Sequence, residues 1–264
     1  MCRRLFLLLG LLFSTSAPAL EDLAWEEVGR IPHDPRAFTQ GLVYGAGALW
    51  ESTGRWGHSS LRRIDPVEGR VLKRVGLPSR LFGEGLALVG ERLYQLTWRS
   101  GEGRIYDLKL RLRGTFSLAP LREGWGIAWD GRVLLVSDGS HRLHRLDPLT
   151  WRWGEALEVT EAGIPLDRLN ELEVVAGRIL ANVWKRDRIA VIEPSRGVVN
   201  GWIDLGSLAE EARKEGGGVL NGIAWWPASE NPRGEGILVV TGKNWPWMAL
   251  LRVPALQSRQ PPVP

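Results

Sequence analysis

Cysteine is almost absent from this sequence, and its scarcity excludes several kinds of chemistry. Among the 264 residues the only cysteine is Cys2, at the extreme N-terminus. A chain processed behind that position can form no disulfide and has no thiol nucleophile. Its stability must come from an apolar core, and an apolar content of 44% is sufficient to build one.

The common catalytic and nucleotide-binding motifs are also missing. The 4 histidines do not have the spacing of a zinc site. There is no Gly-x-Ser-x-Gly elbow, and the Gly-x-Gly pieces open apolar strands rather than helices, which does not fit a dinucleotide fingerprint. The net charge is +4, but the basic residues are scattered, so we expect no nucleic-acid partner.

A continuous apolar run is found only near the N-terminus. Arg3 and Arg4 precede an apolar block that ends at Phe13, and Ala17-Pro-Ala19 fits a small-x-small cleavage site. The block is too short for a typical membrane-spanning helix. We therefore expect residues 1–19 to be a signal peptide and the mature protein to be exported, periplasmic or secreted, in a bacterium. No stable membrane anchor would remain after cleavage; an uncleaved anchor is the alternative.

A repeated pattern covers the rest of the chain, in which an apolar strand, a tight turn and a second apolar strand follow one another. The repeats begin at Phe38, Phe82, Glu123, Leu169 and Leu220. Asp130-Gly131 between two apolar runs is a strong hairpin signal. Further strands follow each hairpin, and four strands in a period of roughly 45 residues are typical of a β-propeller.

Closure of the predicted propeller depends on the last repeat. After its hairpin it has only one more strand, residues 247–253, whereas the N-terminal segment 25–31 is a strand without a hairpin partner. Pairing the two removes two open sheet edges. We therefore predict an all-β, five-bladed β-propeller over residues 20–256, with the last blade closed by the N-terminal strand. A short helix is expected at residues 208–214, and residues 257–264 are expected to be a disordered tail.

Propeller topology brings the start of each first strand and the end of each second strand to one face of the disk. On this sequence that face collects Phe38, Gln40, Phe82, Glu84, Trp98, Trp125, Asn170, Glu171, Trp184 and Lys243. Apolar walls with a few convergent polar groups are typical of a small-ligand site. Structural interpretations remain open: the tryptophans can pack between blades, Gln40 and Asn221 can satisfy backbone groups, and Glu171 can pair with an arginine.

Glu84 is the strongest candidate for a functional carboxylate. A carboxylate near the propeller axis, with indoles beside it, is costly unless it is paired. Its neighbours Gly83 and Gly85 would let a ligand backbone approach closely. Lys243 is either a neutralising partner of Glu84 or a contact of the ligand.

Motifs in every repeat resemble the plant-type glutaminyl-peptide cyclotransferases. They are Phe38-Thr-Gln-Gly-Leu42, Phe82-Gly-Glu-Gly85, Gln95-Leu-Thr-Trp98, Gly124-Trp-Gly126, Leu169-Asn-Glu-Leu-Glu173, Ala181-Asn-Val-Trp184 and Thr241-Gly-Lys243. Each motif is weak alone, but together they are specific and cover nearly the whole mature chain. This family has a five-bladed propeller fold, in agreement with the prediction from the repeats.

The resemblance implies an activity and assigns residues to it. Such an enzyme converts the N-terminal glutamine of peptides or proteins to pyroglutamate and releases ammonia. It requires no metal or other cofactor, although a structural divalent cation is left open. The implied catalytic residues are Glu84, Gln40, Asn170 and Lys243, and the implied substrate-binding residues are Phe38, Phe82, Trp98, Trp125 and Trp184. The resemblance also favours a structural role for Glu171.

The implied reaction is an attack by the α-amine on the side-chain amide of the same glutamine, helped by proximity. Glu84 would carry the proton from the amine to the leaving nitrogen. Two alternatives stay open. One is a non-catalytic propeller that binds peptides. The other is a lactonase-type or sugar-dehydrogenase-type propeller enzyme, for which Glu84, Glu171 and Asn221 would hold a divalent ion.

Overall fold

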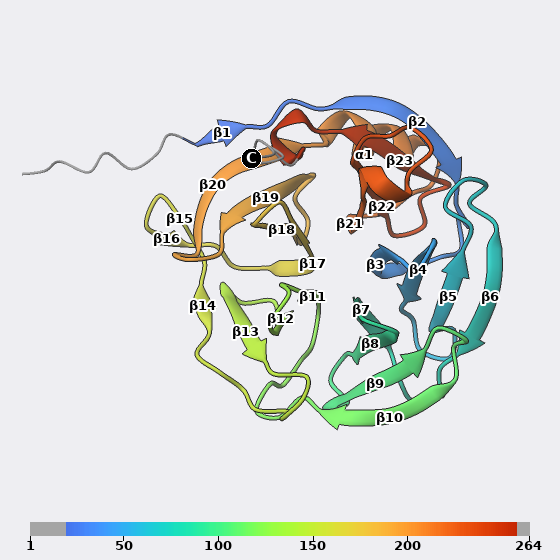
Figure 1. The fold of residues 1–264 in the computed structure, drawn as a ribbon, viewed down its shortest axis with the longest axis vertical. Coiled ribbons are helices and arrows are strands. Elements are labelled where there is room, and N and C mark those ends of the chain that lie inside the picture. Colours follow the sequence, from blue (N-terminus) through green and yellow to red (C-terminus); the bar gives the residue numbers. More distant parts are fainter. Residues whose placement is uncertain (1–19, 258–264) are drawn as a thin grey trace, which may run out of the picture.

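The structure is a computed structural model, and it describes residues 20–257. The predicted signal peptide and residues 258–264 lie outside the described residues. Five sheets stand around a common axis, with β3, β7, β11, β17 and β21 innermost and later strands toward the rim (Figure 1). No helix among the described residues is long and apolar enough to cross a membrane.

Four of the sheets are four-stranded antiparallel blades, in which the strands follow one another from the axis outward. The first contains β3 (Thr39–Gly45), β4 (Ala48–Thr53), β5 (Ser60–Ile64) and β6 (Val71–Gly76). The second contains β7 (Gly83–Val89), β8 (Arg92–Thr97), β9 (Glu102–Asp107) and β10 (Leu112–Ser117). The third contains β11 (Ile127–Trp129), β12 (Leu134–Ser137), β13 (Arg142–Leu146) and β14 (Leu157–Glu158). The last contains β21 (Leu220–Trp226), β22 (Ile237–Gly242), β23 (Trp247–Arg252) and β2 (Glu26–Pro32).

The remaining sheet has seven strands. Its regular part is β17 (Leu169–Val175), β18 (Arg178–Val183), β19 (Arg188–Glu193) and β20 (Val198–Asp204). Three two-residue strands extend it: β1 (Glu21–Asp22), β15 (Thr160–Glu161) and β16 (Ile164–Pro165). Both β1 and β15 pair in parallel with the outer edge of β20, and β16 pairs with β15.

The predicted five-bladed propeller is wrong in its blade count. The described residues form four four-stranded blades, and the seven-stranded sheet is not a fifth copy of that repeat. The physical reason is that β20 would otherwise present an open edge of unpaired backbone groups, and the short strands cover this edge. A strand of two residues is too short to show an alternating apolar pattern, so the sequence does not predict it.

The predicted closure by the N-terminal strand is confirmed. Strand β2 pairs antiparallel with β23 from Glu26 opposite Arg252 to Pro32 opposite Trp247. The ion pair between Arg252 Nη1 and Glu26 Oε2, at 2.6 Å, joins the same two strands. This closure ties the two ends of the described chain into one sheet and covers the edge that β23 would otherwise leave open.

Helix α1 (Gly206–Lys214) confirms the helix predicted at residues 208–214, and it buries Leu208, Ala209 and Ala212. Two short 3-10 turns, η1 (Ala228–Glu230) and η2 (Pro254–Leu256), complete the elements. Gln257, placed by the sequence in the tail, exchanges two hydrogen bonds with Gly236. The rest of the predicted tail lies outside the described residues.

The apolar core lies between neighbouring sheets. One cluster joins Trp50 and Leu61 of the first blade to Leu86, Leu93 and Tyr106 of the second. Comparable clusters join the other neighbouring sheets around the ring. Each sheet therefore buries both faces, which fixes its place around the axis and holds the ends of the first strands at constant positions.

Candidate active site

A cavity of about 610 Å³ lies at one end of the axis, and we call it the aromatic cavity. Its lining contains all nine predicted site residues together with Arg99 and Glu123. Glu171, which topology alone had also placed on this face, is absent from the lining. The cavity is thus built from the starts of first strands and the ends of second strands.

The same backbone turn presents residues to the cavity from several sheets. In every sheet except the third blade, the residue after the second strand donates its N–H to the carbonyl just before the first strand, as Trp98 does to Phe82 and Lys243 does to Val219, both at 2.9 Å. The next residue has a positive φ: 53° at Arg99 and 62° at Asn244. Left-handed backbone at residues other than glycine is strained and clusters at functional sites.

Aromatic rings form most of the cavity wall. Phe82 meets Phe38 and Trp98 edge-on, with ring centroids 6.2 and 5.6 Å away, and Trp125 meets Trp184 at 5.9 Å. Edge-to-face packing at these separations is favourable and keeps each ring in place. The sequence missed a further ring: Trp56 is 50% exposed and packs against Phe82 at 5.6 Å. It extends the aromatic wall toward solvent.

Glu123 is a second residue that sequence reasoning missed. Its Oε2 accepts the indole N–H groups of both Trp98 and Trp125, at 2.7 and 2.9 Å, and its Oε1 accepts a bond from Arg99. Burial alone would raise the pKa of Glu123, but these bonds hold that pKa below its ordinary value. The repeat offered a signal, because Glu123 occupies the position of Phe82 in the preceding repeat. Glu123 therefore fixes the orientation of two cavity walls.

A model of the glutamine cyclotransferase family matches residues 6–253. The chain belongs to this family. It is 43% identical over 225 residues to the glutaminyl-peptide cyclotransferase of Arabidopsis thaliana, covering 84% of this chain and 68% of the relative. The crystal structure of Myxococcus xanthus glutaminyl cyclase superposes with a TM-score of 0.80 and 33% identity, over 89% of this chain and 98% of the other. The family and the enzyme activity predicted from the sequence are confirmed; the residue roles stay predictions.

In the aromatic cavity of this cyclotransferase, the two buried ionisable side chains are Glu84 and Lys243. Burial raises the pKa of Glu84 well above its ordinary value, while the Lys243 charge and a hydrogen bond with Gln40 act in the opposite direction. Burial likewise lowers the pKa of Lys243, and the Glu84 charge partly offsets this. A carboxylate whose pKa is raised is a stronger base than an ordinary one, and once protonated it can return the proton.

Lys243 is held against an aromatic ring. Its Nζ lies 4.7 Å from the centroid of Phe38, and Arg55 Cζ lies 4.8 Å from the same centroid. An ammonium close to a ring face gains cation–π stabilisation, which partly compensates for its lost hydration. The wall at Phe38 is therefore the electropositive side of the cavity.

Two amide oxygens of the cavity have no hydrogen-bond partner among residues 20–257. They are Gln40 Oε1 and Asn170 Oδ1, and both side chains are buried. A buried acceptor left unpaired costs free energy, so such atoms in a native protein usually face a ligand or water. In this family member they are available to accept N–H groups of a substrate.

The glycines beside Glu84 have a different role from the predicted one. A Cβ at Gly85 would stand 2.7 Å from the backbone of the third blade, at Gly126, and a Cβ at Gly83 would stand 2.7 Å from Thr53 O. These glycines therefore let neighbouring blades approach closely rather than clear room for a ligand. Gly41 has the same role between the first and second blades, since a Cβ at this position would lie 2.4 Å from Leu86 N.

The polar residues around the axis outside the cavity bind backbone instead. Glu171 Oε1 accepts the N–H of Leu42 at 3.0 Å, and Asn221 Nδ2 donates to Thr39 O at 3.1 Å. Each bond joins two sheets that meet at the axis. No group of three or more His, Cys, Asp or Glu side chains that could hold a metal occurs in residues 20–257. A cage of Glu84, Glu171 and Asn221 would contain only two such side chains, so this finding does not bear on it, and metal independence stays a proposal.

Proposed function

We propose that this family member cyclises N-terminal glutamine of peptides or proteins to pyroglutamate, with Glu84 as the proton carrier and without a metal ion. The observation that carries the proposal is a buried carboxyl with a raised pKa, in an aromatic cavity, beside two unpartnered amide oxygens. A peptide N-terminus is a small group with N–H donors, which matches these acceptors.

The reaction forms one C–N bond and breaks another. The α-nitrogen of the glutamine attacks its own side-chain carbonyl carbon, and Glu84 in its ionised form takes a proton from that nitrogen. The tetrahedral centre then collapses, the bond to the amide nitrogen breaks, and Glu84 returns the proton to that nitrogen. Ammonia leaves, so atoms and protons balance and Glu84 ends in its starting state.

The raised pKa of Glu84 suits both halves of this cycle. A carboxylate with an ordinary pKa would be a weak base toward the amine, whereas burial makes Glu84 a stronger one. Lys243 lies on the electropositive side of the cavity, where its ammonium can stabilise the developing oxyanion. Gln40 and Asn170 hold the amine and the amide through their side-chain amides.

The aromatic walls supply position and exclude water. Holding the glutamine side chain folded brings its amine and its amide carbonyl together, and proximity of this kind supplies a large part of an intramolecular acceleration. Trp98 and Trp125 are fixed by Glu123, so the space between them does not need to be organised when the substrate binds. We also propose that the signal peptide is removed and that the mature enzyme acts outside the cytoplasm, without a membrane anchor.

The test is ammonia release from glutaminyl-alanine amide, with and without EDTA, by the mature chain and by Glu84→Gln. We expect EDTA-resistant release from the wild type and a thousandfold loss, to order of magnitude, in the variant. Release abolished by EDTA and restored by a divalent ion would overturn the metal-free mechanism. Tight binding of the peptide without any release would instead support a binding propeller.

A further inference from the structure

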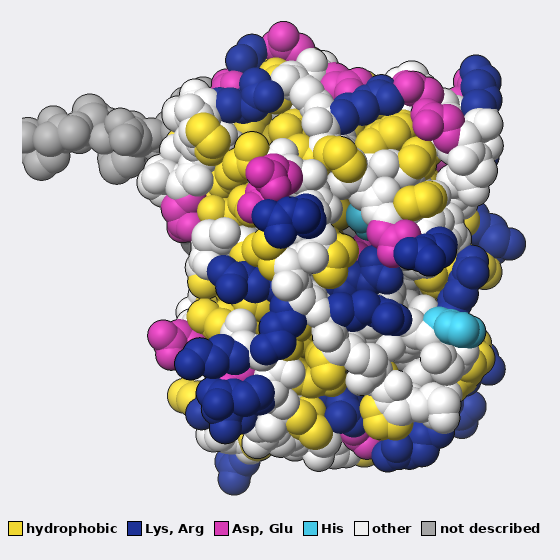
Figure 2. All heavy atoms as spheres, turned by 90° about the vertical axis from the view of Figure 1, so that its right-hand side faces the viewer, with side chains coloured by type: hydrophobic (Ala, Val, Ile, Leu, Met, Phe, Trp, Pro, Cys, Tyr) yellow, Lys and Arg dark blue, Asp and Glu magenta, His cyan; other side chains and the backbone are white. Residues whose placement is uncertain are grey.

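A second cavity of about 620 Å³ lies beside the aromatic cavity, and we call it the basic cavity. Its ionisable lining consists of four arginines, one histidine and one aspartate: Arg36, Arg55, Arg62, Arg74, His58 and Asp34. Figure 2 shows the side of the molecule that carries β6, and Lys and Arg side chains gather across its middle. Positive charge lining a concave surface concentrates field and attracts anions.

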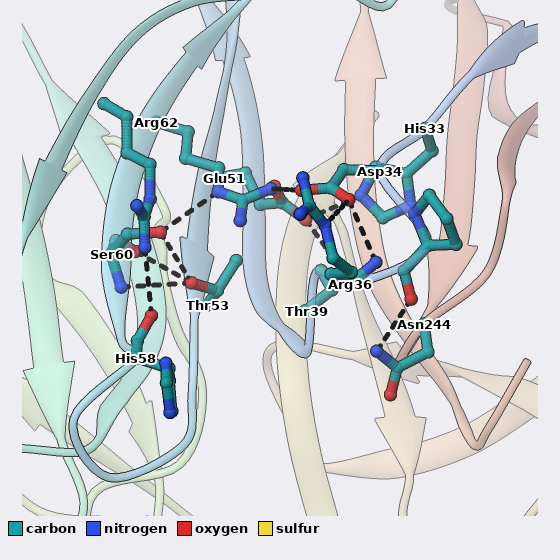
Figure 3. Close-up of polar contacts among 12 residues, drawn as sticks. His33, Asp34, Arg36, Thr39, Glu51, Thr53, His58, Ser60, Arg62 and Asn244 are labelled. Atoms are coloured by element: carbon teal, nitrogen blue, oxygen red, sulfur yellow. Dashed lines mark hydrogen bonds and ion pairs between the residues drawn. The ribbon is translucent and has the colours of Figure 1, made fainter.

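The floor of the basic cavity is a rigid arginine. Arg62 is buried; its Nη1 donates to Asp34 Oδ2 at 3.1 Å and its Nε to Ser60 Oγ at 3.0 Å. Behind it lies Glu51, whose Oε1 meets His33 Nε2 at 2.8 Å (Figure 3). Because this network fixes the guanidinium, an anion bound there would not have to order a flexible side chain.

The other three arginines stand around the opening with few anionic partners. Arg74 donates to the backbone carbonyl of His58 at 3.3 Å, and Arg55 donates to Asn244 Oδ1 at 2.9 Å. Arg36 pairs with Asp34 at 3.3 Å, the same carboxylate that Arg62 uses. Asp34 is therefore shared by two arginines, and Arg62 also pairs with the buried Glu51 at 3.5 Å. Arg55 and Arg74 bind only neutral oxygens. Four guanidinium groups against two carboxylates leave the cavity electropositive.

Only a thin wall separates the two cavities. Gly54 lines the basic cavity, and a Cβ there would stand 2.3 Å from Phe82 Cε1 and 3.1 Å from Gln40 Cγ, both in the aromatic cavity. Arg55 belongs to the basic cavity and lies over Phe38, a wall of the aromatic cavity. A chain that leaves the aromatic cavity past Phe38 meets the basic cavity next.

We propose that the basic cavity binds a carboxylate side chain of the substrate, carried by one of the residues that follow the N-terminal glutamine. This inference rests on the proposed function, because it takes the glutamine to occupy the aromatic cavity. An extended chain advances about 3.3–3.6 Å per residue, so the next few residues reach past the wall. Guanidinium groups bind carboxylates through paired hydrogen bonds, which selects aspartate or glutamate over their amides.

The test is a position scan with matched peptides. One aspartate is moved through positions two to five of a pentapeptide amide that begins with glutamine and is otherwise alanine, and each peptide is compared with its asparagine counterpart. We expect aspartate at one or two positions to lower KM roughly 3- to 10-fold with kcat unchanged, and the gain to shrink as salt rises. An equal KM for aspartate and asparagine at every position would overturn the inference.

Three single variants and one double variant locate the effect. In Arg36→Gln and Arg74→Gln the preference for aspartate over asparagine should fall toward one, whereas Arg70→Gln, a matched charge removal on the same blade outside the cavity, should keep it. A preference that persists in the double variant Arg36→Gln/Arg74→Gln would place the carboxylate elsewhere and contradict the proposal.

A binding measurement separates this inference from the proposed function. The same peptides are titrated by calorimetry into Glu84→Gln, with inorganic phosphate as a competitor. Tighter binding of the aspartate peptide, relieved by phosphate, supports the subsite whether or not the wild type releases ammonia. Turnover of the alanine peptide with no aspartate preference in binding leaves the proposed function standing and removes the subsite.

Discussion

Two glutamates near the axis, Glu84 on β7 and Glu171 on β17, are both buried carboxyls with raised pKa values. Glu84 precedes the close-contact glycine of its strand and faces the aromatic cavity. Glu171 stands one repeat position later, where the other first strands carry glycine, and it binds the backbone of β3. Side chains of adjacent strand residues point to opposite faces of the sheet. A shift of one position in the repeat therefore turns the Glu84 side chain into the cavity and the Glu171 side chain toward the backbone of a neighbouring sheet.

Neutralising each carboxyl in turn should separate the roles of Glu84 and Glu171 most strongly. Glu84→Gln should lower kcat by about a thousandfold, because the variant cannot carry a proton. Glu171→Gln should keep kcat within about threefold of the wild type, because Glu171 does not line the cavity. Ammonia release by both purified variants, with folding checked by near-UV circular dichroism, measures the contrast. Comparable losses in the two would show that the comparison is wrong.

The next largest effect concerns the spacing of the first strands. In Gly85→Ala the new Cβ meets only backbone atoms at 2.7 Å, and we expect a loss of about 3 kcal/mol in the free energy of unfolding. Gly76→Ala is the control, because nothing lies within 4 Å of its Cβ, and its change should stay below about 1 kcal/mol. Urea unfolding measures both. Equal stability of the two variants would mean that close approach at the axis does not depend on glycine.

A smaller effect is expected where Glu123 orients the cavity walls. Glu123→Gln keeps one acceptor for the two indole N–H groups and loses the ion pair with Arg99. We expect kcat/KM to fall about tenfold, mainly through KM, since one hydrogen bond with a charged acceptor is lost. Steady-state kinetics measure kcat and KM of Glu123→Gln beside the control Glu91→Gln, whose side chain is exposed. An unchanged KM would show that Glu123 does not position the cavity walls.

The smallest effect is a pH dependence of stability that belongs to Glu171. Burial raises the pKa of this carboxyl well above 4.5, and the bond from Leu42 N–H only partly opposes the rise. The folded state then binds a proton that the unfolded chain has released, so this contribution to stability is full below pH 4.5 and falls as pH rises toward the folded pKa. Unfolding free energies at pH 5 and pH 8 should therefore drop more in the wild type than in Glu171→Gln. Parallel curves would contradict a raised pKa at Glu171.

Much of this arrangement follows from the repeat in the sequence. Hairpins with clear turns, such as Asp130-Gly131, predict where the strands lie and on which face of the disk their ends meet. The nine site residues predicted from this topology and the family resemblance line one cavity. The blade count failed because β1, β15 and β16 are two residues long and pair with an edge that only the folded chain creates.

The missed residues share another cause. Glu123 and Trp56 act through contacts with residues of neighbouring repeats, and the direction of those contacts depends on packing rather than on strand register. Gly85 was given the wrong role for the same reason, since the atoms nearest to it come from the next blade. The repeat pattern predicts the face on which a residue lies, but it does not predict which residue of a neighbouring sheet that residue contacts.

A titration of the Glu84 carboxyl tests its role as proton carrier directly. Carbon-13 NMR of the protein labelled at glutamate side-chain carboxyls, with Glu84→Gln used to assign the resonance, reports the pKa of that group in the folded enzyme. We predict a pKa well above 4.5 that rises further in Lys243→Met, since the opposing positive charge is removed. A Glu84 that titrates at its ordinary pKa, together with normal ammonia release by Glu84→Gln, would show that Glu84 is not the proton carrier.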